Sequence, residues 1–329
     1  MKTKNKRSLI SCIYQKVSIE QIILLTSLID LTLNMNNSNE LHDIFTKEDE
    51  AFKFICNSGL LYDNGICDDC GGIFYAYKDD STYSGFILKC STCHKKKSIF
   101  FKSIFTKSKI PLCKILHIIY CWSLQYSRNQ AEHETGCSPD TITNYYQACR
   151  QACHQWQMSE QPKIGGPGLT VEIDESQMTK RKNNVGRITN EQWIFGGICR
   201  ETRERFVVPV HDRTAETLLP LIETYIANGS NINSDSWKSY SKIHELDSDY
   251  NHNIVNHHRN FVDPQTGTHT QTIERMWREV KRVKRRSEGI RNSDVDFHIS
   301  EYLWRSHFKV TQFNAFTMTI KLIADTYYY

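Results

Sequence analysis

The sequence predicts an α/β (α+β) protein in which a domain built on a mixed sheet follows a small β-rich module and a helical segment. Its 329 residues are enough for two or three domains, and 39% hydrophobic with 24% charged residues is ordinary for a folded, soluble chain. Two C-x-x-C pairs lie among short β-type runs, and helical spacing follows over residues 110–156. Alternating strand patterns begin after the Pro- and Gly-rich residues 162–168.

These changes of pattern place six segments along the chain. Residues 19–33 have apolar side chains near helical spacing, and the polar residues 34–50 indicate a linker or loop. The expected boundaries are 1–50 for this helix and linker, 51–106 for the β-rich module, 107–160 for the helical module, 161–168 for a linker, 169–310 for the sheet domain and 311–329 for a C-terminal helix.

Apolar stretches and cysteine usage argue against a membrane or secreted protein. Residues 22–33 are interrupted by polar side chains and fall short of the ~18 apolar residues that a membrane span needs. Basic residues near the N-terminus faintly imitate a signal peptide, but no small-residue cleavage site follows them. Four of the twelve cysteines form C-x-x-C pairs and the others are scattered among apolar residues, which suits a reducing compartment.

The two cysteine pairs have the spacing of a structural zinc site. Cys67 and Cys70 are separated from Cys90 and Cys93 by 19 residues, within the range of four-thiolate zinc ribbons. Four soft ligands make the closed tetrahedral shell that structural zinc prefers, so we expect one Zn²⁺ in a zinc ribbon at 51–106. Cys56 and His94 are alternative ligands, and four buried small residues without metal are the other interpretation.

The helical module contains a helix-turn-helix-like pattern. Ala131 begins a short helix, Gly136 supplies the turn, and Ser138 caps a second helix over residues 141–150 with Pro139 at its first position. Such a helix pair places side chains in a DNA major groove, whereas an ordinary helical hairpin packs only internally. The candidate DNA contacts are Thr141, Thr143, Asn144 and Gln147.

The order of elements after residue 168 favours an RNase H-like mixed sheet. Residues 169–178, 192–199 and 205–210 predict an antiparallel meander, followed by a helix over 214–227. Short strands are expected at 231–234 and 253–256, with a strong helix at 269–286.

This order brings three acids to one edge of the sheet. Asp174 lies within the first strand, Asp235 follows the fourth strand, and Glu274 lies on the late helix. Hard oxygen ligands suit Mg²⁺ or Mn²⁺, and two such ions about 4 Å apart support phosphoryl displacement. Lys281 lies about two turns after Glu274 on the same helical face, where it is placed to hold a DNA phosphate. Trp277 also lies on that face, and a core role is favoured for it.

The late helix belongs to the most basic part of the chain. Between Arg275 and Arg291 eight basic residues face two acids, a local charge of +6 in a chain with a net charge of +4. A helix with this excess can follow a DNA backbone, and a solvated helix face is the alternative. The arginines expected to contact DNA are Arg278, Arg282 and Arg285.

Five segments resemble the DDE transposases of the Merlin superfamily and their bacterial insertion-sequence relatives. They read VEIDES at 171–176, SDSWKSY at 234–240, NH at 256–257, FVDP at 261–264 and HTQTIERMWREVK at 269–281, within a likeness covering about residues 52–307. The resemblance implies that Asp174, Asp235 and Glu274 are the catalytic triad, with 60 and 38 residues between successive members, and that Lys281 accompanies them.

The resemblance also implies an activity and partners. The expected enzyme cuts transposon ends and transfers the 3′ hydroxyl to target DNA, with two Mg²⁺ or Mn²⁺ ions as cofactors. Its partners are double-stranded DNA, namely terminal repeats and target, and further copies of itself on DNA. The nucleus is the expected location, or the cytoplasm for a bacterial protein. A domesticated DNA-binding protein without catalysis, a purely hydrolytic nuclease and a zinc-ribbon scaffold are the rival functions.

Overall fold

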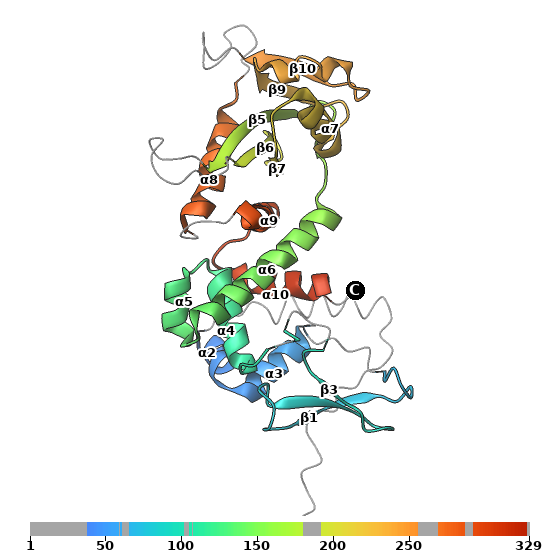
Figure 1. Cartoon of the computed structure of the whole chain (residues 1–329), viewed down its shortest axis with the longest axis vertical. Coiled ribbons are helices and arrows are strands. Elements are labelled where there is room, and N and C mark those ends of the chain that lie inside the picture. Colours follow the sequence, from blue (N-terminus) through green and yellow to red (C-terminus); the bar gives the residue numbers. More distant parts are fainter. Residues whose placement is uncertain are drawn as a thin grey trace, which may run out of the picture. The chain divides into compact units, whose positions relative to one another are not determined.

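The computed structural model divides into two compact units, one of residues 1–152 with 311–329 and one of residues 153–310 (Figure 1). The helix expected at residues 19–33 lies outside the described part of the chain. The structure describes residues 38–58, 60, 66–101, 105–106, 108–179, 192–255, 269–286 and 292–327.

The helices of the first unit enclose an aromatic and aliphatic core. They are α2 (Ser38–Thr46), α3 (Glu48–Asn57), α4 (Leu112–Ser123), α5 (Arg128–Thr135), the first part of α6 (Pro139–Glu160) and α10 (Ala315–Tyr327). Phe316 of α10 stacks on Phe54 of α3 at 5.7 Å between ring centroids and meets Phe45 of α2 edge-on at 5.9 Å. The C-terminal helix therefore completes this core.

Helices α2 and α3 correct the expectation of a linker or loop at residues 34–50. Ile44, Phe45, Phe52 and Ile55 are all buried, at positions that share one face of each helix. The charged residues Lys47, Asp49 and Lys53 are exposed to solvent. The sequence of this segment is typical of a loop because polar residues outnumber apolar ones. The few apolar residues are sufficient for two helices because the rest of the unit covers them.

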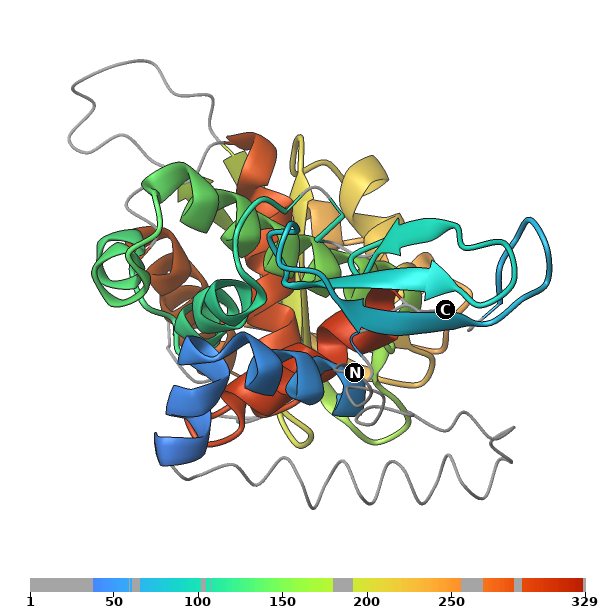
Figure 2. The same ribbon diagram turned by 90° about the horizontal axis from the view of Figure 1, so that it is seen from below.

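A three-stranded antiparallel sheet forms the β-rich module of the first unit (Figure 2). Its strands are β1 (Phe74–Lys78), β2 (Phe86–Cys90) and β3 (Lys96–Ser98), in that spatial order. Phe86 stacks on Phe52 of α3 with 3.8 Å between the ring centroids, which fixes the sheet against the helices of its own unit.

The second unit is built on a five-stranded mixed sheet in the order β10-β9-β5-β6-β7. The three antiparallel strands pair as the sequence predicts, and β9 and β10 join them in parallel. This arrangement confirms the expected RNase H-like mixed sheet. The strands are β5 (Thr170–Thr179), β6 (Gln192–Cys199), β7 (Arg205–Val210), β9 (Asn231–Asp235) and β10 (Asn251–Val255).

Helices cover both faces of this sheet. On one face, Val171 and Ile173 of β5 pack with Leu218 and Ile222 of α7 (Ala215–Tyr225). On the other lie α8 (Gln271–Arg286) and α9 (Val295–His307), with α8 buried along its face formed by Ile273, Met276, Trp277 and Val280.

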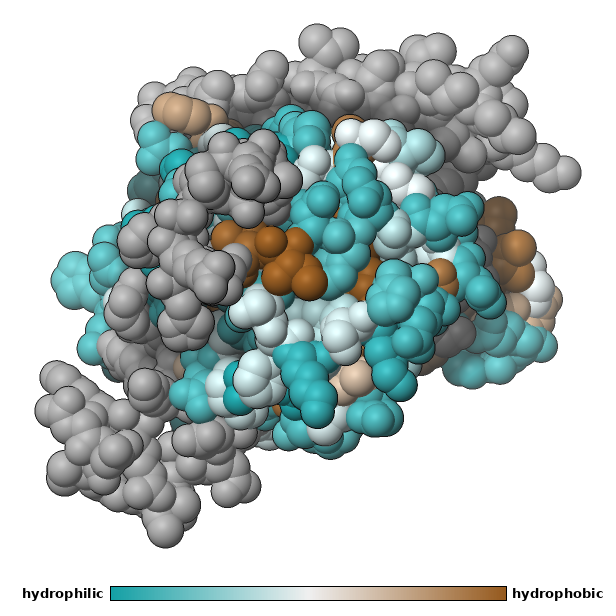
Figure 3. All heavy atoms as spheres, turned by 90° about the horizontal axis from the view of Figure 1, so that it is seen from above, coloured by the Kyte–Doolittle hydropathy of each residue, from teal (hydrophilic) through white to brown (hydrophobic). Residues whose placement is uncertain are grey.

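Smaller elements complete the second unit. Strand β4 (Ile164–Gly165) pairs in parallel with β8 (Ile226–Ala227), so residues expected to form a linker contribute to the fold. Short 3-10 helices lie at η2 (Lys238–Tyr240), η3 (Ile243–Glu245) and η4 (Asn292–Asp294). No helix in the described ranges is both long and apolar enough to span a bilayer. In Figure 3 the described surface is mostly hydrophilic, with hydrophobic residues in small patches.

Candidate active site and candidate metal centre

Asp174 and Asp235 lie on neighbouring parallel strands. Glu172 of β5 pairs with Asn233 of β9, and the two aspartates follow two residues later on their strands. Because side chains alternate between the faces of a sheet, both carboxylates leave on the face that carries α8. The sheet register thus brings together two acids with 60 residues between them in the sequence.

The carboxylate of Asp174 is in a desolvated, negatively charged environment. Burial, with smaller contributions from the charges of Asp235 and Glu274, raises the pKa of Asp174 to about 6, against the lowering effect of a hydrogen bond from Trp277. The negative charges of Asp235 and Glu274 therefore act on the carboxylate of Asp174.

Trp277 holds Asp174 in place. Its indole Nε1 donates a hydrogen bond of 2.8 Å to Asp174 Oδ2, and its ring is buried between α8 and the sheet. Gly196 is the residue opposite Asp174 on β6, and a Cβ at this position would come within 2.8 Å of the Trp277 ring. The absence of a side chain at Gly196 lets α8 approach closely enough for this bond. Trp277 thus combines the expected core role with direct contact to a candidate metal ligand.

Glu172 ties the start of α8 to β5, a role that the sequence analysis did not assign. Its carboxylate is fully buried and accepts a 2.9 Å hydrogen bond from the backbone N–H of Ile273. Arg200 Nε donates to the other oxygen at 2.5 Å, and Arg200 also donates to the carbonyl of His269. Glu274 follows Ile273 directly, so this clamp sets the position of the third acid relative to the strand that carries Asp174. In the sequence, this role is indicated by the position of Glu172, a charged residue between the apolar strand residues Val171 and Ile173.

The three carboxylates do not gather at metal-binding distance in this structure. Trp237 N–H donates to Asp235 Oδ1 at 2.9 Å, and Glu274 is exposed on α8. Within the described ranges, the one group of three or more His, Cys, Asp or Glu side chains gathered at metal-binding distance is the cysteine group below. The donor set of three carboxylates nevertheless fits hard divalent cations, which prefer oxygen ligands.

The basic side of α8 begins beside Glu274. Residues four and seven positions later, Arg278 and Lys281, share its helical face, with Arg278 exposed and Lys281 half-buried. Arg282 is exposed on the adjoining face. Arg285 lies further along α8, and its side chain lies outside the described part of the structure.

A second buried acid lies behind Asp174, on the opposite face of β5. Burial raises the pKa of Glu175 to about 7, and the charge of Asp174 adds to the effect, while Arg213 opposes it. Tyr240 lies next to Glu175, and burial followed by the charge of Glu175 raises the pKa of its phenol well above the usual value. Neither residue was singled out from the sequence, although Glu175 follows Asp174 directly.

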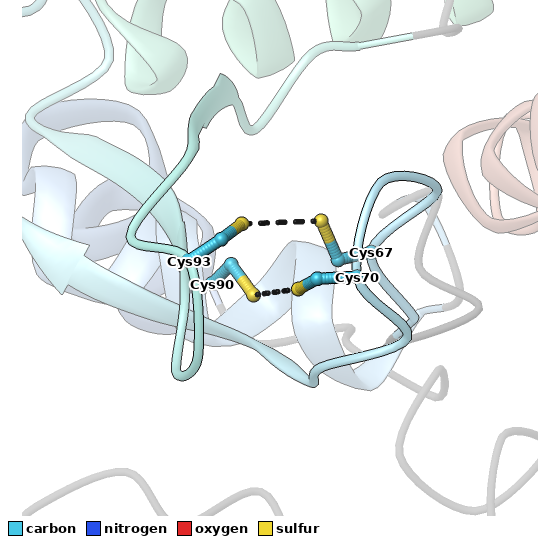
Figure 4. A group of neighbouring side chains, drawn as sticks. All are labelled: Cys67, Cys70, Cys90 and Cys93. Atoms are coloured by element: carbon cyan, nitrogen blue, oxygen red, sulfur yellow. Dashed lines mark hydrogen bonds between the residues drawn. The ribbon is translucent and has the colours of Figure 1, made fainter.

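The four cysteines of the ribbon converge as their spacing predicts (Figure 4). Their sulfurs all lie within 4.8 Å of one another, with Cys67 and Cys93 at 3.6 Å and Cys70 and Cys90 at 3.5 Å. Zn–S bonds of about 2.3 Å in a tetrahedron place sulfurs about 3.8 Å apart, so the group fits zinc. A Cβ at Gly72 would meet Cys90 Sγ at 2.8 Å, which explains the glycine between the two cysteine turns.

The helix-turn-helix pattern is present in the first unit. Ser127 caps α5 through a reciprocal pair of hydrogen bonds with Gln130, and Gly136 adopts the left-handed conformation at φ 66°. Ser138 Oγ accepts from the Thr141 backbone at 3.3 Å, the N-cap expected for the second helix. Of the candidate DNA contacts, Thr143 and Asn144 are exposed, whereas Thr141 and Gln147 are half-buried.

Comparison with known proteins finds a transposase domain that is similar to the sheet domain. Residues 165–311 match the ISXO2-like transposase domain, a range that includes Asp174, Asp235 and Glu274. A similar solved structure is a chain of the cryo-EM structure of the simian T-cell lymphotropic virus intasome in complex with PP2A regulatory subunit B56 gamma. It is 15% identical with a TM-score of 0.30, over 54% of this chain and 68% of that chain. A search of curated proteins finds no match.

Proposed function

We propose, from the match of residues 165–311 to the ISXO2-like transposase domain, that this chain cuts transposon ends and joins their 3′ hydroxyls to target DNA. The observation that supports this proposal is the placement of Asp174 and Asp235 on neighbouring parallel strands beside α8, which carries Glu274. Burial, and to a smaller extent the charges of Asp235 and Glu274, raise the pKa of Asp174 at this place. Clustered carboxylates with a raised pKa are typical of sites that hold cations or move protons.

The three carboxylates would hold Mg²⁺ or Mn²⁺. Two such ions activate an attacking oxygen and stabilise a leaving one. The chain's own residues prepare the site: Trp277 fixes one oxygen of Asp174, and the Trp237 backbone N–H fixes one oxygen of Asp235. Lys281, on the same helical face as Glu274, would bind the phosphate next to the reacting bond.

DNA recognition would involve both units. Arg278, Arg282 and Arg285 would follow the backbone along α8, since lysine and arginine contacts to phosphate supply affinity without reading sequence. The helix pair α5–α6 would read bases with side chains such as Thr143 and Asn144, which are exposed. A transposon has two ends, so we expect two or more copies of the chain to act together on DNA.

The cysteine group would hold one structural Zn²⁺. All four ligand positions are filled by thiolates, and a closed shell leaves no place for a substrate. Its role is therefore to hold together the short strands β1–β3. The unit that contains it also carries the helix pair, and we propose that both contribute to recognition of the transposon ends.

The test is incubation of the purified full-length protein with labelled transposon-end DNA, unlabelled target DNA and Mg²⁺. We expect both cleaved ends and products in which the labelled 3′ end is joined to target. Cleavage without joining would indicate a hydrolytic nuclease instead. Binding without cleavage under Mg²⁺ or Mn²⁺ would indicate a domesticated DNA-binding protein.

A further inference from the structure

An arginine is held between two indole rings beside the candidate active site. The guanidinium carbon of Arg213 lies 3.9 Å from the centroid of the Trp193 ring and 4.6 Å from that of Trp237. Arg213 precedes α7, Trp193 lies near the start of β6, and Trp237 follows β9. Three separate segments of the second unit therefore meet at this cation.

Hydrogen bonds fix the two loops that carry Arg213 and Trp237. The carbonyl of Arg213 accepts bonds from Trp237 Nε1 at 3.3 Å and from Ser239 Oγ at 2.6 Å. Asp212 Oδ1 accepts from Thr214 N at 2.9 Å, which holds the Arg213 loop to the start of α7. The platform is thus preorganised, and little conformational entropy remains to be lost when a ligand binds.

Arg213 makes no ion pair with the residues that the structure describes. Within the part of the chain that the structure describes, no carboxylate lies within ion-pair distance of its guanidinium. Stacking on the indole faces stabilises the cation and leaves the edge of the guanidinium plane for other partners. A planar guanidinium with this geometry matches the oxygens of a phosphate.

The outer part of the platform is exposed next to a candidate metal ligand. Trp237 is 40% exposed, an unusual degree for the largest apolar side chain. It lies two residues after Asp235 and donates its backbone N–H to Asp235 Oδ1. Two residues span at most ~7 Å between their Cα atoms, so Trp237 lies next to Asp235 in space as well as in sequence.

We propose that Arg213 and Trp237 bind an unpaired nucleotide of the DNA strand that enters the active site, an inference that rests on the proposed function. Trp237 stacks on the base and Arg213 binds a backbone phosphate of the same strand. Aromatic rings stack on bases of any sequence, but the face of a base is available only where it has left the duplex stack. The ligand is therefore single-stranded or frayed DNA at the end, not intact duplex.

The test compares two end substrates in the absence of added divalent cation, so that binding is measured without cleavage. One is a fully paired duplex, and the other has three unpaired nucleotides containing 2-aminopurine at the terminus. The wild type should bind the second more tightly and change its 2-aminopurine fluorescence. Trp237→Ala and Arg213→Gln should lower affinity for the unpaired substrate by about 5- to 100-fold, with the duplex affinity nearly unchanged.

Two matched variants separate binding from folding. Trp237→Phe keeps an aromatic face and should retain most of the preference, and Arg203→Gln removes an exposed cation at the opposite end of the β6–β7 hairpin and should change nothing. If wild type and Trp237→Ala bind both DNAs with the same affinity, the platform proposal is wrong and the proposed function is unaffected. The same conclusion follows if Trp237→Ala loses thermal stability and binds both substrates more weakly by the same factor. Failure of the wild type to bind either DNA would overturn the proposed function with it.

Discussion

Glu172→Gln tests whether the buried clamp at the start of α8 positions the candidate active site. The substitution keeps the shape of the side chain and removes its charge. Glu172 is fully buried, whereas the side chain of Arg200 is 23% exposed. The variant leaves Arg200 without its anion and weakens the charge-assisted bond to the Ile273 N–H. Both changes act at the base of the helix that carries Glu274.

The expected destabilisation is about 3 kcal/mol. Removing one partner of a buried ion pair costs about 3–5 kcal/mol, and the partial exposure of Arg200 favours the lower end because water can solvate the cation left behind. For a unit of this size, each kcal/mol lowers Tm by about 2–4 °C, so a fall of about 6–12 °C is expected. Strand cleavage should also decrease at temperatures where the variant is folded, since Glu274 loses its fixed position.

Chemical and thermal denaturation of the full chain measure this effect. Glu216→Gln, in the exposed first turn of α7, is the matched control and should change stability by less than about 0.5 kcal/mol. Arg200→Met should be costly alone, and the double variant Glu172→Met with Arg200→Met should recover much of the loss, since an apolar pair can replace a buried ion pair. Strict additivity of the single changes Glu172→Met and Arg200→Met in this double variant, or a wild-type Tm for Glu172→Gln, would refute the reasoning.

Three further predictions concern the carboxylates, the cysteines and pH. The near-isosteric changes D174N, D235N and E274Q should each abolish Mg²⁺-dependent cleavage with DNA affinity nearly unchanged. K281A should instead weaken binding of the transposon end and leave residual cleavage. Cleavage at the wild-type rate by D174N or E274Q would show that the triad assignment is wrong. Metal analysis of purified protein should find one zinc per chain, and a folded protein with near-zero zinc would disprove the ribbon site. The pKa values of Asp174 and Glu175 are raised to about 6 and about 7, so the folded state binds protons more tightly than the unfolded state. Their contribution to stability is therefore full below about pH 4 and is lost as pH rises through 6 to 7. Without added divalent cation, the free energy of unfolding of D174N should fall less between pH 5 and pH 8 than that of the wild type. The same pH dependence in both proteins would contradict this prediction.

Local patterns in the sequence are sufficient to predict much of this protein. The two C-x-x-C turns are short-range features, and their sulfurs meet in the structure within 4.8 Å. The β-rich runs that become β5, β6 and β7 are separated by short connections, and this spacing predicts the antiparallel meander. The order of these elements also predicts that Asp174 and Asp235 share an edge.

Contacts between distant residues were decided only by the tertiary structure. Trp277 reaches Asp174 across 103 residues of sequence, and Ile273 reaches Glu172 across 101. Helices α2 and α3 looked like a loop because Phe316, near the other end of the chain, supplies part of the apolar surface that they pack against. A side chain's own neighbours in sequence determine its local conformation, whereas strand register and helix packing select its partner. The clamp at Glu172 and the stacked Arg213 therefore became visible only once the sheet and its helices were assembled.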